Sequence, residues 1–330
     1  MTAQDIKKLL AGDDMTLASF ISLIERDSPQ VPEIMKSVSA HTGRAYRIGI
    51  TGPPGAGKST LINSLTTLLR EQGSSVAILA VDPSSPFKGG AILGDRIRMQ
   101  KHYMDEGVFI RSLATRGVKG GLTWAISQII DLVDATGKDY ILLETVGVGQ
   151  SELDIIGHVD TVVVVLVPDA GDSIQTMKAG IMEIADIFVV NKSDLAGVDK
   201  LVNNMNITLD LNKGRGDWQI PVLKCRADQN DGVAALLDQI LLHKHMLESG
   251  GLLEERRGRQ RVQQFEQMLE QKVLAEIKST ILNSKEINTI EKMIGKGEMS
   301  PYAALNRIME PGSPSFIIRK TRINSDKRSK

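Results

Sequence analysis

The sequence lacks the features of disulfide-bonded, zinc-binding and membrane-spanning proteins. Its one cysteine, Cys225, cannot form an internal disulfide, and its five histidines are too scattered to form a Cys/His cluster of zinc spacing. Its longest apolar run, Val162–Pro168, falls well short of the roughly 20 residues that a membrane helix needs. Residues 1–10 include several charges and no secretory signal pattern. We therefore expect a cytoplasmic protein with no membrane association.

The chain also lacks a net charge. Its 40 basic and 40 acidic residues cancel, so no overall positive charge would hold the protein on nucleic acid. General nucleic-acid binding is therefore not expected. With 330 residues, 42% of them apolar, the chain is long enough for two domains or for one large domain with appendages.

Short β-rich runs alternate with helical patterns over residues 44–248. This alternation predicts a doubly wound α/β domain with a mostly parallel sheet. Val162 to Val165 is a run of four valines, as expected for a strand that is buried on both faces. The predicted strands are Tyr46–Ile50, Val76–Asp82, Val108–Ser112, Tyr140–Glu144, Thr161–Val167, Ile187–Asn191 and Pro221–Cys225.

Helical segments flank this domain on both sides. Residues 1–43 form a predicted helical extension, and residues 249–310 form a helical arm that begins with a long charged helix around Glu254–Ser279. The apolar stripe of that helix needs a partner surface, which a second subunit would supply in a homodimer. Residues 311–330, rich in basic side chains, are expected to be a flexible tail.

The clearest motif directly follows the first predicted strand and precedes a helical pattern. It matches G-x-x-x-x-G-K-[ST], a phosphate-binding loop. Glycines let backbone N–H groups surround a diphosphate, the helix start adds positive potential, the lysine neutralises the terminal phosphates, and the serine offers a hydroxyl to Mg²⁺. The weaker alternative is that this segment is a glycine turn that contains a lysine by chance. The candidate residues are Gly52, Pro53, Gly55, Ala56, Gly57, Lys58, Ser59 and Thr60.

A second motif predicts guanine as the base. Asn191, Lys192 and Asp194 form N-K-x-D at the end of a predicted strand, where the carboxylate accepts hydrogen bonds from guanine N1–H and its amino group. Adenine lacks this donor pair, so it would leave a carboxylate unsatisfied at a cost of roughly 1–3 kcal/mol. Arg226 and Ala227 lie where related GTPases contact the base with a Ser-Ala pair, so an arginine replaces the serine.

Carboxylates at the ends of other strands are the candidate ligands of Mg²⁺. Asp82 and Glu144 end predicted strands, and Asp95 follows a glycine-rich segment. Together with Ser59 they would supply the hard oxygen ligands that Mg²⁺ prefers. Each carboxylate could instead cap the following helix, and this alternative is strongest for Asp95.

A switch motif follows the fourth predicted strand. Glu144 to Gln150 resembles the D-x-x-G switch, in which the amide of Gly147 would sense the γ-phosphate. Many small GTPases have a water-orienting glutamine after this glycine, whereas this chain has Val148. We therefore expect slow GTP hydrolysis in the absence of a partner. Lys58, Asp82, Asp95, Glu144 and Gly147 are the candidate catalytic residues.

Taken together, these motifs closely resemble the MeaB/ArgK-type GTPases over about residues 3–310. The resemblance implies a P-loop domain with a helical N-terminal piece and a C-terminal dimerisation arm. It also implies a GTPase chaperone that gates cofactor delivery to an adenosylcobalamin-dependent methylmalonyl-CoA mutase and protects that enzyme. The resemblance rests on Gly52–Ser59, Val81–Pro86 with Gly94–Arg96, Phe109–Arg111 with Arg116, Gly117, Gly120 and Gly121, and Glu144–Ser151.

The same resemblance implies a third switch at Asp169–Lys178 that signals to the mutase, with Asp172, Gln175 and Lys178 as its residues. From the residues alone, Lys178 is equally well explained as an exposed helix lysine. Pro168–Ala170 replaces the family's usual glycine pair, and the region 198–217 is short. The partner stays open among methylmalonyl-CoA mutase, isobutyryl-CoA mutase and another acyl-CoA mutase.

Three other functions fit parts of the sequence. A P-loop kinase that phosphorylates a periplasmic transport protein would share the phosphate loop but would not ordinarily need N-K-x-D. A metal-insertion GTPase would need His or Cys ligands, which are scattered here. A dimeric scaffold with a degenerate pocket is disfavoured by the intact Lys58, Ser59, Asp82 and Glu144.

Overall fold

A computed structural model describes the chain in seven segments: residues 2–82, 100–114, 121–145, 157–168, 182–211, 218–277 and 285–309. Several predicted site residues lie outside these segments: Asp95, Gly147, Asp172, Gln175 and Lys178. The predicted tail 311–330 lies outside them as well.

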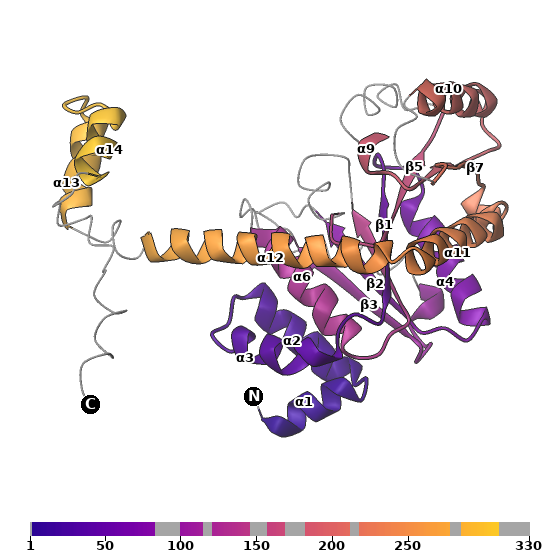
Figure 1. The fold of residues 1–330 in the computed structure, drawn as a ribbon, viewed down its shortest axis with the longest axis horizontal. Coiled ribbons are helices and arrows are strands. Elements are labelled where there is room, and N and C mark those ends of the chain that lie inside the picture. Colours follow the sequence, from indigo (N-terminus) through magenta and orange to yellow (C-terminus); the bar gives the residue numbers. More distant parts are fainter. Residues whose placement is uncertain are drawn as a thin grey trace. The chain divides into compact units, whose positions relative to one another are not determined.

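The centre of the fold is a parallel sheet with the strand order β3-β2-β4-β1-β5-β6-β7 (Figure 1). All seven predicted strands are confirmed to within two residues at each end. The run of four valines lies in β5, whose six residues are all buried. The strands are β1 (Tyr46–Thr51), β2 (Val76–Asp82), β3 (Val108–Ala114), β4 (Tyr140–Thr145), β5 (Thr161–Leu166), β6 (Ile187–Val190) and β7 (Val222–Lys224).

Helices cover both faces of this sheet, as in a doubly wound fold. On one face, α4 (Lys58–Glu71) and α11 (Val233–Ser249) share an apolar core with the strands. On the other face, α6 (Gly121–Asp134) and α10 (Val198–Leu211) do so. The remaining described helices of this part are the short η2 (Gln100–His102), α9 (Met182–Ile184) and η4 (Ala227–Gln229).

The N-terminal helices extend the second core, because α2 and α3 pack against α6. Side-chain caps begin the first two helices: Thr2 and Asp5 form a capping box, and Asp13 accepts a hydrogen bond from the Thr16 amide. These caps agree with the helical extension predicted for residues 1–43. The elements are α1 (Ala3–Leu10), α2 (Asp14–Glu25), α3 (Val31–Val38) and η1 (Ser39–His41).

The chain divides into two compact units, residues 1–264 and 265–330. The long charged helix is α12 (Leu252–Ile277), which begins in the first unit and ends in the second. The second unit also has α13 (Lys285–Gly295) and α14 (Pro301–Met309), with Ile287, Ile290 and Ala304 buried. Large apolar side chains along α12 are exposed in the single chain: Val262, Phe265, Met268, Leu269, Val273 and Leu274.

No helix in the described segments combines the length and the apolar character needed to cross a lipid bilayer.

Candidate functional site

The predicted phosphate loop has the predicted context, since β1 ends at Thr51 and α4 begins at Lys58. Two of its glycines cannot be replaced without a clash. At Gly52 (φ +147°), a Cβ atom would lie 2.1 Å from the carbonyl oxygen of Val165. At Gly57 (φ +88°), it would lie 2.3 Å from Nδ2 of Asn191. The loop therefore turns tightly against β5 and the base motif, as a cradle of backbone N–H groups requires.

Lys58 lies over this loop with only 6% of its surface exposed. Its Nζ donates to the carbonyl oxygens of Gly52 at 2.9 Å and Pro53 at 3.0 Å. These two bonds hold the ammonium group at the loop. A phosphate oxygen is a stronger acceptor for an ammonium group than a carbonyl is, because the bond then joins two charged groups.

Ser59 and Glu144 meet in front of the same helix. The Ser59 hydroxyl donates to Oε1 of Glu144 at 2.7 Å, and both residues are buried. A hydroxyl and a carboxylate are hard oxygen donors, so the pair fits the ligand chemistry of Mg²⁺. In the described segments, no cluster of three or more His, Cys, Asp and Glu side chains forms a complete metal site.

The base motif follows β6, at the carboxyl edge of the sheet, as predicted. Asn191 is buried, and its Nδ2 donates to the carbonyl oxygen of Ala56 at 2.8 Å. Its Oδ1 accepts a hydrogen bond from the amide of Ala227 at 3.1 Å. Asn191 therefore joins the phosphate loop to the loop after β7. Lys192 has a left-handed backbone (φ +58°), and the next amide, that of Ser193, donates to the Cys225 carbonyl.

Asp194 and Arg226 lie together at the more exposed end of this motif. Nε of Arg226 is 3.6 Å from Oδ1 of Asp194 and 3.5 Å from Oδ1 of Asp228. The side chains of Arg226 and Asp194 are 40% and 44% exposed. The residue that replaces the usual serine is therefore ion-paired with the predicted base-reading carboxylate, and both side chains remain accessible to a ligand.

For the remaining predicted residues, the structure gives a backbone position, an exposure or a single contact. Asp82 is the last residue of β2 and lies in register with Ala114 of β3, so its backbone is at the carboxyl edge. Thr60 is exposed on the first turn of α4. Pro53 contributes its carbonyl oxygen to the Lys58 contact, and Gly55 has a left-handed backbone at φ +76°.

Sequence reasoning missed two supports of the base loop. Ser64 of α4 donates its hydroxyl hydrogen bond to the carbonyl oxygen of Ala227 at 3.0 Å. Gly232 is required because a Cβ atom there would lie 2.3 Å from the carbonyl oxygen of Lys224. Burial raises the pKa of the Cys225 thiol to about 12, so this residue stays a neutral core side chain. No sequence motif indicates the contacts of Ser64 and Gly232, because each joins residues that come together only in the folded chain.

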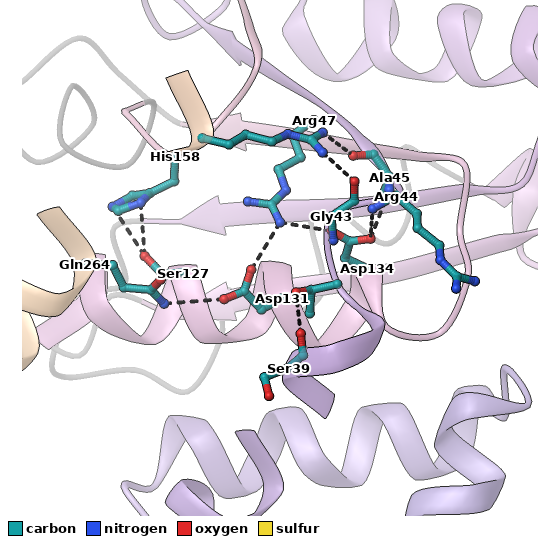
Figure 2. Close-up of polar contacts among 12 residues, drawn as sticks. Ser39, Gly43, Arg44, Ala45, Arg47, Ser127, Asp131, Asp134, His158 and Gln264 are labelled. Atoms are coloured by element: carbon teal, nitrogen blue, oxygen red, sulfur yellow. Dashed lines mark hydrogen bonds and ion pairs between the residues drawn. The ribbon is translucent and has the colours of Figure 1, made fainter. Parts of the chain in front are cut away.

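Sequence reasoning also missed a polar cluster at the opposite, amino edge of the sheet. The carboxylate of Asp134 accepts from the amides of Gly43, Arg44 and Ala45 and from the guanidinium of Arg47 (Figure 2). Arg47 also bonds to Asp131, which in turn accepts a longer contact of 3.4 Å from Gln264 of α12.

Arg257 of α12 completes this amino-edge cluster. Its guanidinium makes two hydrogen bonds to Asp160, at 2.9 and 2.6 Å, and further bonds to the carbonyl oxygens of Gly43 and Ala45. The Arg257 and Asp160 side chains are 5% and 0% exposed. Burial is the largest single influence and would lower the pKa of Arg257, but the bond to Asp160 and the charges of Asp160, Asp134 and Glu254 together raise that pKa overall. The start of α12 is thereby fastened to β1 and β5.

Fold and site together define a P-loop nucleotide-binding protein with a guanine-type base motif. The family described as methylmalonyl Co-A mutase-associated GTPase MeaB matches residues 17–281, which is most of the chain. The chain therefore belongs to the MeaB family and is a GTPase.

Individual relatives agree with this assignment. A putative GTPase of Pyrococcus abyssi is 44% identical over 308 residues, covering 92% of this chain and 95% of the relative. The GTPase ArgK of Escherichia coli is 32% identical and covers 91% of this chain and 96% of the relative. A crystal structure described as a LAO/AO transport system kinase has a TM-score of 0.71, with 28% identity over 92% of this chain and 95% of that chain.

Proposed function

We propose that this GTPase is a chaperone of an adenosylcobalamin-dependent acyl-CoA mutase, most simply methylmalonyl-CoA mutase. In this role it would gate cofactor loading and protect the mutase from inactivation. The observation that carries the proposal is the match of residues 17–281 to a family described as mutase-associated GTPases. The sheet edge with Lys58, Ser59, Glu144 and Asn191 supplies the nucleotide chemistry that such a role requires.

Phosphate binding is assigned to the loop and the start of α4. Lys58 would exchange the Gly52 and Pro53 carbonyls for terminal phosphate oxygens, which are charged and therefore stronger acceptors. The backbone amides of the loop and the positive end of α4 would face the other phosphate oxygens. Gly55, Ala56, Gly57 and Thr60 complete the proposed phosphate contacts.

Mg²⁺, when bound, would neutralise phosphate charge during phosphoryl transfer. Ser59 and Glu144, already 2.7 Å apart, are the residues proposed to hold the ion, together with Asp82 and Asp95. The Ser59 hydroxyl would turn from Glu144 toward the ion, because a hydroxyl proton cannot lie between its oxygen and a cation. Glu144 would then accept bonds from the waters that Mg²⁺ retains.

Guanine recognition is assigned to the loops after β6 and β7. Asp194 would accept the N1–H and amino hydrogen bonds of guanine, and the stem of Lys192 would pack along the ring. Ala227, whose amide donates to Oδ1 of Asn191, would lie beside the ring. Arg226 is proposed to contact the nucleotide from its position between Asp194 and Asp228.

The signalling part of the proposal concerns residues outside the described segments. Gly147 would sense the γ-phosphate, and Asp172, Gln175 and Lys178 would carry its state to the mutase. Val148 cannot orient an attacking water, so the chain alone should hydrolyse GTP slowly and the mutase should accelerate it.

The domain roles follow the same proposal. Residues 1–43 are the helical extension, 44–248 the GTPase domain, 249–310 a dimerisation arm and 311–330 a flexible tail. The exposed apolar residues of α12 support a homodimer, since such a row is costly to leave in water. A cytoplasmic location, without nucleic acid or membrane as partner, completes the proposal.

The proposal is tested by mixing the purified protein with methylmalonyl-CoA mutase. GTP hydrolysis should rise when the mutase is added, and the mutase should keep its activity for longer through repeated turnovers. A protein that hydrolyses GTP but neither binds nor protects the mutase would contradict the chaperone role while leaving the GTPase assignment intact. Isobutyryl-CoA mutase in a parallel assay distinguishes the partner.

A second candidate function comes from the name of the structural neighbour, a transport system kinase. If this chain phosphorylated a periplasmic transport protein, γ-labelled GTP would leave its label on that acceptor. We expect free labelled phosphate instead. The third candidate, metal insertion, has little support, because no cluster of three His, Cys, Asp or Glu side chains occurs among the described residues.

A further inference from the structure

A pair of buried threonines joins the two strands that deliver the nucleotide-binding residues. Thr51 is the last residue of β1, directly before Gly52 of the phosphate loop, and Thr145 is the last residue of β4, directly after Glu144. The hydroxyl of Thr145 donates to Oγ1 of Thr51 at 2.9 Å, and both residues are 0% exposed.

This bond lies on the face of the sheet opposite to the Ser59–Glu144 contact. Successive side chains of a strand point to opposite faces. Leu142 of β4 belongs to the core under α4 and α11, whereas Leu143 belongs to the core under α6. By this alternation Glu144 lies on the α4 face and Thr145 on the α6 face. The end of β4 is therefore bonded on both faces of the sheet. Glu144 bonds to Ser59 of α4 on one face, and Thr145 bonds to Thr51 of β1 on the other.

The strand register shows that both bonds lie at the carboxyl ends of β1 and β4. Ile50 of β1 pairs with Glu144, so Thr51 and Thr145 are the next residues along each strand. Thr145 is the last residue of β4, and Gly147 follows it two positions later in the sequence. The Thr51–Thr145 bond is thus the last described side-chain contact between β1 and β4 before the candidate γ-phosphate sensor.

We infer that Thr145, through Thr51, is a positioning residue for GTP hydrolysis. Its hydroxyl ties the end of β4, which precedes Gly147 in the sequence, to the end of β1, which directly precedes the phosphate loop. The inference rests on the proposed role of Gly147. Contacts made only with the γ-phosphate and in the transition state should therefore depend on this bond more than the phosphate-loop contacts that GDP and GTP share. Loss of the bond should therefore lower kcat more than nucleotide affinity.

The test compares Thr145→Val, Thr51→Val and Thr145→Ser in the full chain. Valine keeps the branched shape and strand preference but removes the hydroxyl, whereas serine keeps the hydroxyl. We expect each valine variant to lower kcat for GTP by about tenfold with GDP affinity within about twofold of wild type. Thr145→Ser should retain kcat, and the double valine variant should be no slower than Thr51→Val, because the bond that Thr145→Val removes is already lost when Thr51 is replaced.

The matched control is Thr161→Val. Thr161 is equally buried, at the amino-edge start of β5, where its hydroxyl bonds to Tyr46 and His243. This variant should lose stability and keep kcat, so an equal loss of kcat in it would overturn the inference. Unchanged kcat in both Thr145→Val and Thr51→Val would do so as well, as would an equal loss of GDP and GTP affinity. If wild-type protein bound no GTP, the failure would instead lie with the proposed function.

Discussion

The two edges of the parallel sheet use buried charge differently. At the amino edge, Arg257 bonds to Asp160 and Arg47 bonds to Asp131 and Asp134, so charged side chains are neutralised by others of the same chain. At the carboxyl edge, the ammonium of Lys58 bonds to two backbone carbonyls, and Glu144 accepts from the hydroxyl of Ser59.

This difference indicates at which edge a side chain can exchange its hydrogen-bond partners for a ligand. A buried ion pair is costly to separate because each partner would be left charged in a poorly solvated place. A bond from a lysine to a backbone carbonyl can be exchanged for a charge-assisted bond to a phosphate oxygen. The amino edge is therefore a lasting joint for the start of α12, and the carboxyl edge is where we propose that a nucleotide binds.

Replacing Lys58 by alanine should have the largest effect at the carboxyl edge. Loss of the ammonium removes the charge that would neutralise the terminal phosphates, so GTP binding should become undetectable by calorimetry. Stability should fall less than when a buried ion pair is broken, because the carbonyls of Gly52 and Pro53 that it leaves carry no charge. Lys36→Ala, an exposed lysine on α3, is the control. Normal GTP affinity in Lys58→Ala would refute the phosphate-site assignment.

Replacing Arg257 by alanine should have the converse effect at the amino edge. Asp160 would be left buried without its guanidinium, and such losses cost about 3–5 kcal/mol of unfolding free energy. Urea denaturation measures this change. Arg259→Ala is a close control, because Arg259 lies on the same helix with a side chain that is 74% exposed, and its pair with Glu255 should contribute about 0–1 kcal/mol. Equal effects of the two variants would contradict the contrast between a buried and an exposed pair.

Replacing Asp194 by asparagine should change base preference at the carboxyl edge. The amide cannot accept both guanine hydrogen bonds, and it can donate to the extra carbonyl of xanthine. We expect GTP affinity to fall by about 100-fold and xanthosine triphosphate to bind more tightly than GTP. Competition binding with the two nucleotides measures this. Asp199→Asn, an exposed neighbour, should leave the preference unchanged. Unaltered GTP affinity in Asp194→Asn would mean that another residue reads the base.

The last expected effect is a pH dependence of stability that comes from the amino edge. Burial lowers the pKa of His158 from 6.5 to about 4, and its ring contacts Ser127 (Figure 2). The unfolded chain binds the proton first, so the stabilising contribution is complete above pH 6.5 and is lost as the pH falls from 6.5 toward 4. The slope should be at most about 1.4 kcal/mol per pH unit.

His158→Gln should flatten that part of the stability profile, measured by urea denaturation at several pH values. His41→Gln, an exposed histidine, should leave the profile as it is in wild type. A wild-type profile as flat as that of His158→Gln would show that the folded protein binds the proton at His158 as readily as the unfolded chain does.

Local sequence signals predicted most of the fold and part of the site. All seven strands and the turn from Thr51 to Lys58 were predicted, because hydrophobic alternation and the glycine pattern act over a few residues. The contacts of Asn191 with Ala56 and Ala227 were not predicted in detail, since they join three separate loops. The motif predicted the residue type, and the tertiary structure decided what that residue touches.

The amino-edge cluster shows why the remainder was beyond sequence reasoning. Arg257 and Asp160 lie 97 positions apart, and nothing in either neighbourhood distinguishes them from solvated charges. The sequence by itself determined the succession of strands and helices along the chain, the phosphate loop and the base motif, because these depend on short-range patterns. Only the tertiary structure decided which charges are buried and paired, because burial and pairing depend on chain segments that meet after folding.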